Sequence, residues 1–197
     1  MKEAKAFSPG HITGFFQICD QQEDPLQIGS RGAGVSIARG TATRVRVENS
    51  AKTSVKIMIN GEVTDSASVS EHVANAFLSL NGEHSKVLVE HDVELPIGCG
   101  YGSSGAGAIS LAFALNEAFN NRLSRLEAAQ LAHVAEVECG TGLGTVVAEA
   151  AGGLEIRARS GAPGVGEMQS IPISEDYVAA CLSFGPLSTS RILKDES

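Results

Sequence analysis

The sequence predicts an α+β protein, and three observations carry that prediction. In the first third of the chain, β-branched residues alternate with polar ones between glycine turns, which is typical of half-buried strands. Two Ser-x-x-Glu boxes precede apolar segments with helical spacing. A glycine-rich segment, residues 96–106, joins a predicted strand to a predicted helix. A chain of 197 residues can bury the core of one domain or slightly more.

The predicted strands are alternating segments that end at glycines or charged residues. In residues 87–95, valine and leucine alternate with charged side chains, so this strand should have one face on the core and one in water. We expect strands at Ile12–Ile18, Gly34–Val47, Val55–Ile59, residues 87–95, Leu154–Arg159 and Tyr177–Phe184.

Three helices are expected. Ser68 and Glu71 form a capping box ahead of a helix of about three turns. Residues 104–119 are apolar nearly all round, which favours a buried helix over a surface one. A second capping box, Ser124 with Glu127, should open a helix that runs to about Glu138.

The end of the chain predicts a second unit. Gly185-Pro186 turns the chain after the predicted strand, and residues 188–190 could cap a helix whose body is missing beyond Leu193. We therefore expect residues 1–184 to form one domain and residues 185–197 to begin another, with a frayed tail as the alternative.

Composition narrows the class of protein. The formal net charge is −8, from 15 basic and 23 acidic residues, which argues against a nucleic-acid partner. The four cysteines are far apart, without the paired spacing of a zinc site or a disulfide framework. No apolar run reaches the roughly 20 residues of a membrane span, so the prediction is a cytoplasmic protein without a membrane partner.

Residues 96–106, Pro-Ile-Gly-Cys-Gly-Tyr-Gly-Ser-Ser-Gly-Ala, are expected to bind phosphate. Glycines let the backbone approach a ligand closely, and the start of a helix attracts anions. A Walker loop is excluded because the chain has no Gly-Lys pair, and the dinucleotide pattern from Gly98 fails because Ser103 stands where glycine is required. A purely structural turn is the alternative.

These residues resemble the second motif of the GHMP kinase superfamily, Pro-x-Gly-x-Gly-hydrophobic-Gly-Ser-Ser-small. Residues 8–16, Ser-Pro-Gly-His-Ile-Thr-Gly-Phe-Phe, resemble its first motif. Together with residues 29–35 and 140–145, these segments are most similar to the archaeal pantoate kinases, over nearly the whole chain. The superfamily's third glycine-rich motif is not found before Ser197.

The resemblance implies a fold and an activity. The fold is a GHMP kinase N-terminal, ATP-binding domain with a ribosomal-protein-like β-α-β arrangement, followed by a second domain. The activity is transfer of phosphate from ATP, with Mg²⁺, to the 4-hydroxyl of pantoate in coenzyme A biosynthesis. A homodimer is allowed. The resemblance assigns the ATP phosphates to Pro96, Gly98, Gly100, Gly102, Ser103, Ser104 and Gly105.

Ser104 and Glu136 are the residues that the resemblance assigns to Mg²⁺ and to catalysis. Ser104 could equally cap the helix. Glu138 is an alternative to Glu136 one position out of register, and both glutamates could simply be solvated at a helix end. His133 is a metal ligand by type, although a lone histidine on a helix is commonly packed or solvated.

The superfamily's catalytic aspartate falls near Val146, which cannot accept a proton. Homoserine kinases also lack this aspartate, so the resemblance permits a mechanism based on orientation and electrostatics. His11 is the candidate base, or a cation facing phosphate, because mevalonate kinases have lysine at the matching position. A structural histidine is the alternative.

The resemblance also implies a site for the substrate. Pantoate carries a carboxylate, and Arg31 has the chemistry for bidentate recognition of it. An exposed arginine on a turn is the alternative. The expected substrate-binding residues are His11, Ser30, Arg31, Gly142 and Thr145.

Three other readings remain open. The acceptor could be homoserine, shikimate or a mevalonate-type acid, or the protein could bind ligands without catalysis because it lacks the aspartate. An RNA-binding module is opposed by the acidic charge. Residues 161–166 could form a lid or a plain loop.

Overall fold

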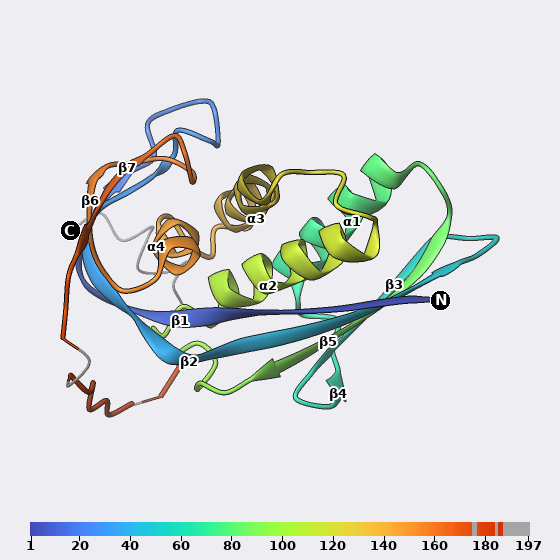
Figure 1. Ribbon diagram of the computed structural model, residues 1–197, viewed down its shortest axis with the longest axis horizontal. Helices are drawn as coiled ribbons and strands as arrows, with labels where there is room; N and C mark the ends of the chain where they lie inside the picture. The colour runs from blue at the N-terminus through green and yellow to red at the C-terminus, as the bar shows by residue number, and fades with distance from the viewer. Residues whose placement is uncertain (175–176, 184, 187–197) are drawn as a thin grey trace.

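The structure is a computed structural model that describes residues 1–174, 177–183 and 185–186. One mixed sheet of seven strands carries the four helices on one face (Figure 1). Its strand order is β4-β3-β5-β2-β6-β7, with β1 paired to β2. The expected α+β fold is therefore confirmed.

The strands include every predicted strand up to residue 159. They are β1 Lys2–Cys19, β2 Gly29–Asn49, β3 Ser54–Ile59, β4 Glu62–Val63, β5 Ser85–Val93, β6 Leu154–Arg159 and β7 Glu167–Ile171.

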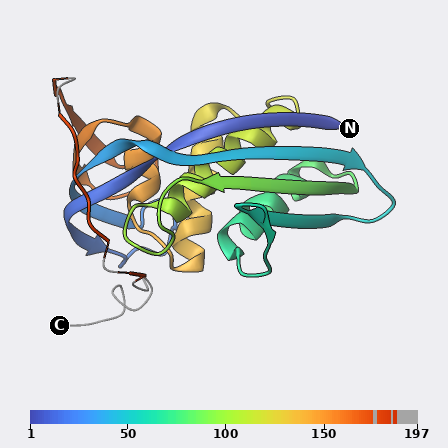
Figure 2. The same cartoon turned by 90° about the horizontal axis from the view of Figure 1, so that it is seen from below.

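β1 and β2 form an antiparallel hairpin much longer than the sequence predicted. Register shifts at Pro9/Gly10 and Thr13/Phe15 break the alternation, which is why the pattern alone suggested shorter strands. β2 pairs with β5 through residues 41–49 and with β6 through residues 32–35, so it joins both halves of the sheet (Figure 2).

The three predicted helices are confirmed as α1 Ser68–Asn81, α2 Ser103–Ala118 and α3 Arg125–Cys139. A fourth, α4 Thr145–Ala151, was not predicted, and neither were β4 and β7. These three elements are short, with seven, two and five residues, so periodicity had little to act on.

One of the two capping boxes is confirmed. Ser124 Oγ accepts from Glu127 N at 3.2 Å, and Glu127 Oε2 accepts from Ser124 N at 2.7 Å. The box at Ser68 is wrong, because the N-cap of α1 is Ala67 and no side chain caps it.

The core lies between the sheet and the helices. α2 is buried on nearly every side, as its composition predicted, because it contacts the sheet below and α1, α3 and α4 around it. The largest apolar side chains that are almost completely buried are Val45, Val73, Val87, Val89, Ile109, Leu111, Leu115 and Val146.

The predicted strand Tyr177–Phe184 is wrong for the described residues 177–183, which form no strand. Tyr177, Val178 and Leu182 are 76%, 93% and 77% exposed, and within the described part of the chain no strand pairs with this segment. The predicted cap at residues 188–190 lies outside the described residues. The division of the chain at residue 184 stays a prediction.

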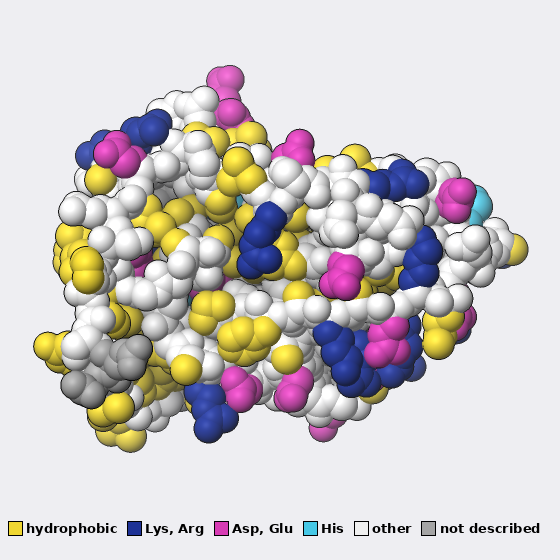
Figure 3. Space-filling view, viewed as in Figure 1, with side chains coloured by type: hydrophobic (Ala, Val, Ile, Leu, Met, Phe, Trp, Pro, Cys, Tyr) yellow, Lys and Arg dark blue, Asp and Glu magenta, His cyan; other side chains and the backbone are white. Residues whose placement is uncertain are grey.

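The surface is mixed in charge. On the face shown in Figure 3, basic side chains lie beside acidic ones, and Arg46 Nε contacts Glu3 Oε2 at 3.2 Å. Among the helices that the structure describes, none is long and apolar enough to cross a membrane.

A buried polar cluster links the two layers at His91. This side chain is 3% exposed, and its Nδ1 lies 2.7 Å from Thr43 Oγ1 while its Nε2 lies 3.0 Å from Ser70 Oγ. Thr43 Oγ1 is also 2.6 Å from Ser110 Oγ on α2. Through Ser70 on α1 and Ser110 on α2, this cluster ties two helices to the sheet.

We predict that His91 makes the protein sensitive to acid. Desolvation lowers its pKa from 6.5 to about 4. Below pH 6.5 the unfolded chain binds a proton that the folded chain rejects, so the free energy of unfolding should fall between pH 6.5 and 4, by up to about 3 kcal/mol. Thermal and urea unfolding across this range measures the loss.

The comparison that isolates this effect is His91→Asn, with the exposed His84→Asn as control. The raised pKa values of Glu136 and Glu149 act in the opposite direction, but they are common to all three proteins. His91→Asn should flatten the fall in stability relative to wild type, and His84→Asn should not. Equal slopes in all three would contradict the prediction.

Candidate active site

A cavity of about 580 Å³ runs across the sheet-to-helix boundary. One end is lined by residues of β3, α1 and β5, among them Ile59, Val69 and Val93, and the other by residues of β1, β2 and β6, most of them polar. Figure 1 shows β3 and α1 toward one side of the molecule and β6 toward the other, with α2 between them and β1 and β2 running along the sheet. The predicted phosphate loop therefore occupies the middle of one continuous cavity.

Every second residue of the glycine loop, from Gly98 to Gly102, has a positive φ angle. Gly98, Gly100 and Gly102 have φ angles of 73°, 82° and 69°, which a residue with a side chain rarely adopts. Gly102 is the N-cap of α2 and offers no side chain, and the first helical bond runs from Ala106 N to Gly102 O. The N–H groups of residues 103–105 are thus free of helical acceptors at a cavity wall, a geometry that suits phosphate.

Ser104 and Glu136 meet in this cavity. Ser104 Oγ donates to Glu136 Oε1 at 2.5 Å, and Thr141 Oγ1 donates to the same oxygen at 2.7 Å. Glu136 is 2% exposed, and its burial raises the pKa of the carboxyl against the opposing effect of the two hydrogen bonds. The predicted partners on α2 and α3 are therefore side by side, whereas Glu138 pairs with His72 on the surface at 3.2 Å.

Glu149 is a second buried carboxyl beside the loop. It is 3% exposed, and within the described residues neither oxygen has a hydrogen-bond partner. A Cβ at Gly102 would lie 2.3 Å from Glu149 Oε1, and one at Gly105 would lie 2.7 Å from Oε2. Desolvation, and secondly the charge of Glu136, raise the pKa of Glu149 well above its ordinary value.

This donor set fits a magnesium ion held partly by phosphate. No group of three or more His, Cys, Asp or Glu side chains in the described residues could hold a metal by itself. Mg²⁺ commonly takes one or two carboxylates and completes its shell with water and substrate oxygens. Ser104 and Glu136 supply such oxygens, and the buried, unpaired oxygens of Glu149 lie beside the same loop.

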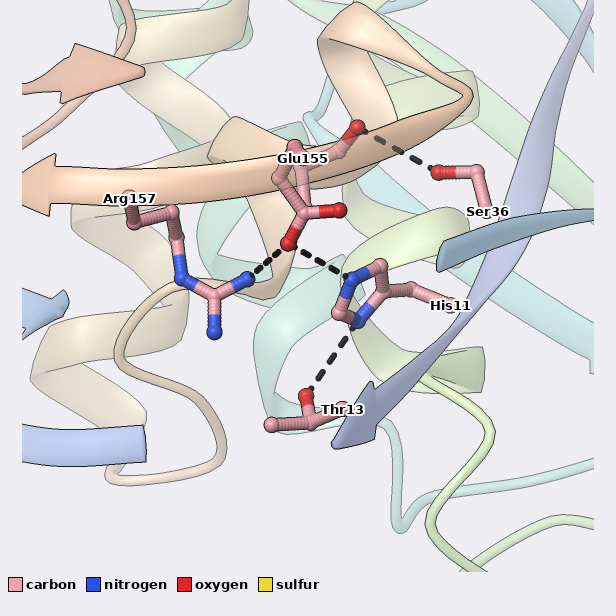
Figure 4. A network of polar contacts seen from close by, with 6 residues as sticks. His11, Thr13, Ser36, Glu155 and Arg157 are labelled. Atoms are coloured by element: carbon pink, nitrogen blue, oxygen red, sulfur yellow. Dashed lines mark hydrogen bonds and ion pairs between the residues drawn. The ribbon is translucent and has the colours of Figure 1, made fainter. Parts of the chain in front are cut away.

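A second polar network lies at the other end of the cavity (Figure 4). His11 Nε2 is 3.1 Å from Glu155 Oε1, and an N–H of Arg157 donates to the same oxygen. His11 Nδ1 is 3.3 Å from Thr13 Oγ1. His11 N donates to Tyr101 O at 3.0 Å, which ties β1 to the glycine loop.

Arg157, and not Arg31, is the arginine that lines the cavity. Arg31 is exposed, because neighbouring strand residues face opposite sides and Ser30 faces inward. Arg157 is 4% exposed and its Nε has no hydrogen-bond partner among the described residues. A Cβ at Gly144 would lie 2.2 Å from Ser30 Oγ and 3.3 Å from Arg157 Nε. Glycine at this position therefore leaves room for both side chains.

Most of the predicted site residues converge on the cavity, and five of the residues singled out from the sequence do not, one of which is the surface residue Glu138. Pro96 and Arg31 do not line it, His133 is packed with Nε2 3.0 Å from Ile28 O, and Val146 is 1% exposed in the apolar core. Those that line it are His11, Ser30, Gly98, Gly100, Gly102, Ser103, Ser104, Gly105, Glu136, Gly142 and Thr145.

Glu149, Glu155 and Arg157 were missed from the sequence. A signal existed for the last two, because they alternate with apolar Leu154 and Ile156 on the predicted strand and so share one face. Glu149 carried no such signal, since α4 itself was not predicted.

Comparison with known proteins shows that the chain is similar to kinases of small molecules. A family model, GHMP kinases N terminal domain, matches residues 68–153. The chain is 38% identical to a pantoate kinase of Thermococcus kodakarensis and 35% identical to one of Methanocaldococcus jannaschii. Each match covers 96% of this chain, and the chain spans 62% and 66% of the length of these two relatives.

Solved structures agree with the fold. A phosphotransferase related to the CoA biosynthesis pathway superposes with a TM-score of 0.82 at 37% identity, over 89% of this chain and 59% of its own. A homoserine kinase from Cytophaga hutchinsonii has a TM-score of 0.61 at 18% identity, over 88% and 53% of the two chains. This second likeness concerns the fold alone.

We predict that Gly142 is required for steric reasons. A Cβ there would lie 2.0 Å from Glu136 Oε2, so Gly142→Ala should displace the buried carboxyl and lower the free energy of unfolding by about 1–3 kcal/mol. Gly14→Ala is the matched control, because its Cβ would meet only Ala33 O at 3.4 Å. Urea unfolding of both variants measures the difference, and equal stability would contradict the packing described.

Proposed function

We propose that this chain, which carries the N-terminal domain of the GHMP kinases, is the nucleotide-binding part of an enzyme that phosphorylates pantoate with ATP. The observation that carries the proposal is the single cavity in which the glycine loop, the Ser104–Glu136 pair and buried Arg157 meet. The 35–38% identity to proteins named pantoate kinase supports the choice of acceptor.

ATP fits the loop and the apolar end of the cavity. The free N–H groups at residues 103–105 would receive the phosphates. Beyond them, Ile59, Val69, Val93 and Ile97 line a region suited to the flat, largely apolar face of a purine base. The phosphate chain would then point from this region toward β6.

Mg²⁺ would be held by Ser104 and Glu136, whose oxygens already lie together. When bound, the ion neutralises charge on the phosphates and supports in-line transfer. The protein's own contribution is to hold these two oxygens in a dry, fixed arrangement, because Thr141 donates to the same Glu136 oxygen that Ser104 contacts.

The acceptor would lie at the polar end, with its carboxylate on Arg157. The free Nε of this guanidinium, near Ser30, offers a donor for an anion, and Glu155 holds the other side of the group. Gly142 and Thr145 complete the lining between this region and the phosphate loop. Arg31 is better suited to the exposed surface on which it lies.

Val146 lies in the core and cannot act as a base, and two mechanisms are compatible with this. Transfer could rely on orientation and electrostatic stabilisation alone, because the transition state requires little covalent help from the protein. Alternatively, the network around His11 could accept the hydroxyl proton. A binding protein without activity is the second candidate function, and it is favoured by the absence of a carboxylate at position 146.

The proposed function predicts pantoate-dependent ADP release by the complete protein with Mg-ATP, and none with homoserine or mevalonate. Ser104→Ala should lower kcat about 100-fold or more, because it removes an oxygen aimed at the metal and phosphates. ADP release with a different acceptor only would support the assignment as a kinase and contradict pantoate as the substrate. No release with any acceptor, together with ATP binding, would favour the binding protein.

A separate prediction concerns the carboxylate. Arg157→Lys should raise KM for pantoate about 10-fold or more while leaving KM for ATP within a factor of about three, because lysine cannot hold Glu155 and the substrate at once. Arg31→Lys is the matched control on the neighbouring strand and should leave both constants unchanged. If Arg31→Lys raises KM for pantoate and Arg157→Lys does not, the substrate carboxylate would be assigned to Arg31 instead.

A further inference from the structure

We propose that Thr13, His11 and Glu155 form a proton relay for the acceptor hydroxyl, in which Thr13 contacts the substrate and Glu155 is a positioning residue. The inference rests on the proposed function and deepens it. Val146 is an apolar side chain in the core and cannot accept a proton. The proton of the substrate hydroxyl therefore needs another acceptor.

Exposure along the network runs in one direction. Thr13 is exposed and lines the cavity, whereas the side chains of His11 and Glu155 have no exposed surface. His11 and Thr13 are two residues apart on β1 and point to one side of the strand (Figure 4). A substrate in the cavity therefore reaches the imidazole through the Thr13 hydroxyl.

The contacts of His11 determine which ring nitrogen is basic. Arg157 carries a permanent charge and donates to Glu155 Oε1, so this oxygen is an acceptor, and His11 Nε2 at 3.1 Å must donate to it. Nδ1 is then the acceptor of the neutral ring, and Thr13 Oγ1 lies 3.3 Å from it. A hydroxyl, an imidazole and a carboxylate in this order form the arrangement that activates nucleophiles in many enzymes.

In the proposed step, the O–H bond of the substrate hydroxyl breaks as its oxygen bonds to the γ-phosphorus of ATP. The bond from that phosphorus to the oxygen of ADP breaks at the same time. The acceptor proton passes to Thr13 Oγ1, whose own proton passes to His11 Nδ1. The imidazolium is stabilised by Glu155 and returns its proton to solvent through Thr13 after the product leaves.

The charged groups around the imidazole support this assignment. Glu155 and Arg157 face it from β6, and Glu149 on α4 lies near its backbone, since both meet a Cβ built at Gly102. Arg157 offsets the charge of Glu155 in the resting state. A carboxylate substrate on Arg157 would add negative charge, which favours a proton on His11 during the reaction.

The first test is kinetic and uses the complete protein. Thr13→Val should lower kcat about 100-fold with little change in either KM, and Thr13→Ser should restore most of it. The matched control is Thr53→Val, because Thr53 Oγ1 makes a similar contact, 2.9 Å, with His84 Nδ1 on the surface. Full activity in Thr13→Val, with pantoate still phosphorylated by wild type, would overturn the relay alone.

The second test does not depend on activity. Nitrogen-15 NMR of the histidine rings should show the neutral His11 ring protonated at Nε2, because this nitrogen must donate to Glu155 Oε1. In kinetics, Glu155→Gln should lower kcat about 10-fold or more while leaving KM for ATP unchanged. Glu155→Asp should restore most of this loss, which would also show that the chain folds. A neutral ring protonated at Nδ1 would overturn the proposal.

The two failures are distinguishable. Absence of pantoate-dependent ADP release from wild type would overturn the proposed function and the relay with it. ADP release that survives Thr13→Val at the wild-type rate, or an unchanged kcat in Glu155→Gln, would overturn the relay while the kinase assignment stands.

Discussion

Three buried carboxyls lie beside the glycine-rich loop, and the local structure must accommodate them. Glu136, Glu149 and Glu155 are each at most 3% exposed, next to the proposed phosphate site. A buried carboxylate must be neutralised by a proton, a hydrogen bond or a cation. Each of the three meets this condition differently: Glu136 accepts from two hydroxyls, Glu155 accepts from Arg157, and Glu149 has a strongly raised pKa.

Glycine residues leave the space that these buried carboxyls occupy. Gly102, Gly105 and Gly142 each stand where a Cβ would collide with a glutamate oxygen. Gly102 also gives the loop a left-handed turn, as Gly98 and Gly100 do, and as the N-cap of α2 it leaves the first N–H groups of the helix open. Gly102 therefore serves both the loop conformation proposed to receive phosphate and the space that Glu149 occupies.

The long hairpin of β1 and β2 brings the two ends of the site together. β1 contributes His11 and Thr13, and its bond from His11 N to Tyr101 O fixes the strand to the glycine loop. β2 pairs with β6, which contributes Glu155 and Arg157. The proposed nucleotide and acceptor sites thus share one sheet, an arrangement that favours catalysis by positioning in phosphoryl transfer.

Local periodicity was enough to predict the α+β class, three helices and most strands. The contiguous glycine motif indicated a candidate phosphate loop, and its family resemblance indicated Ser104 and Glu136, which the fold brings into contact. That Arg157 and not Arg31 lines the cavity, that Val146 is core, and that Glu149 and Glu155 are buried beside the site became visible only in the folded chain. The physical reason is that a strand pattern assigns residues to two faces without saying which faces a cavity. Contacts such as His11 with Glu155, 144 positions apart, depend on sheet order, which no local pattern encodes.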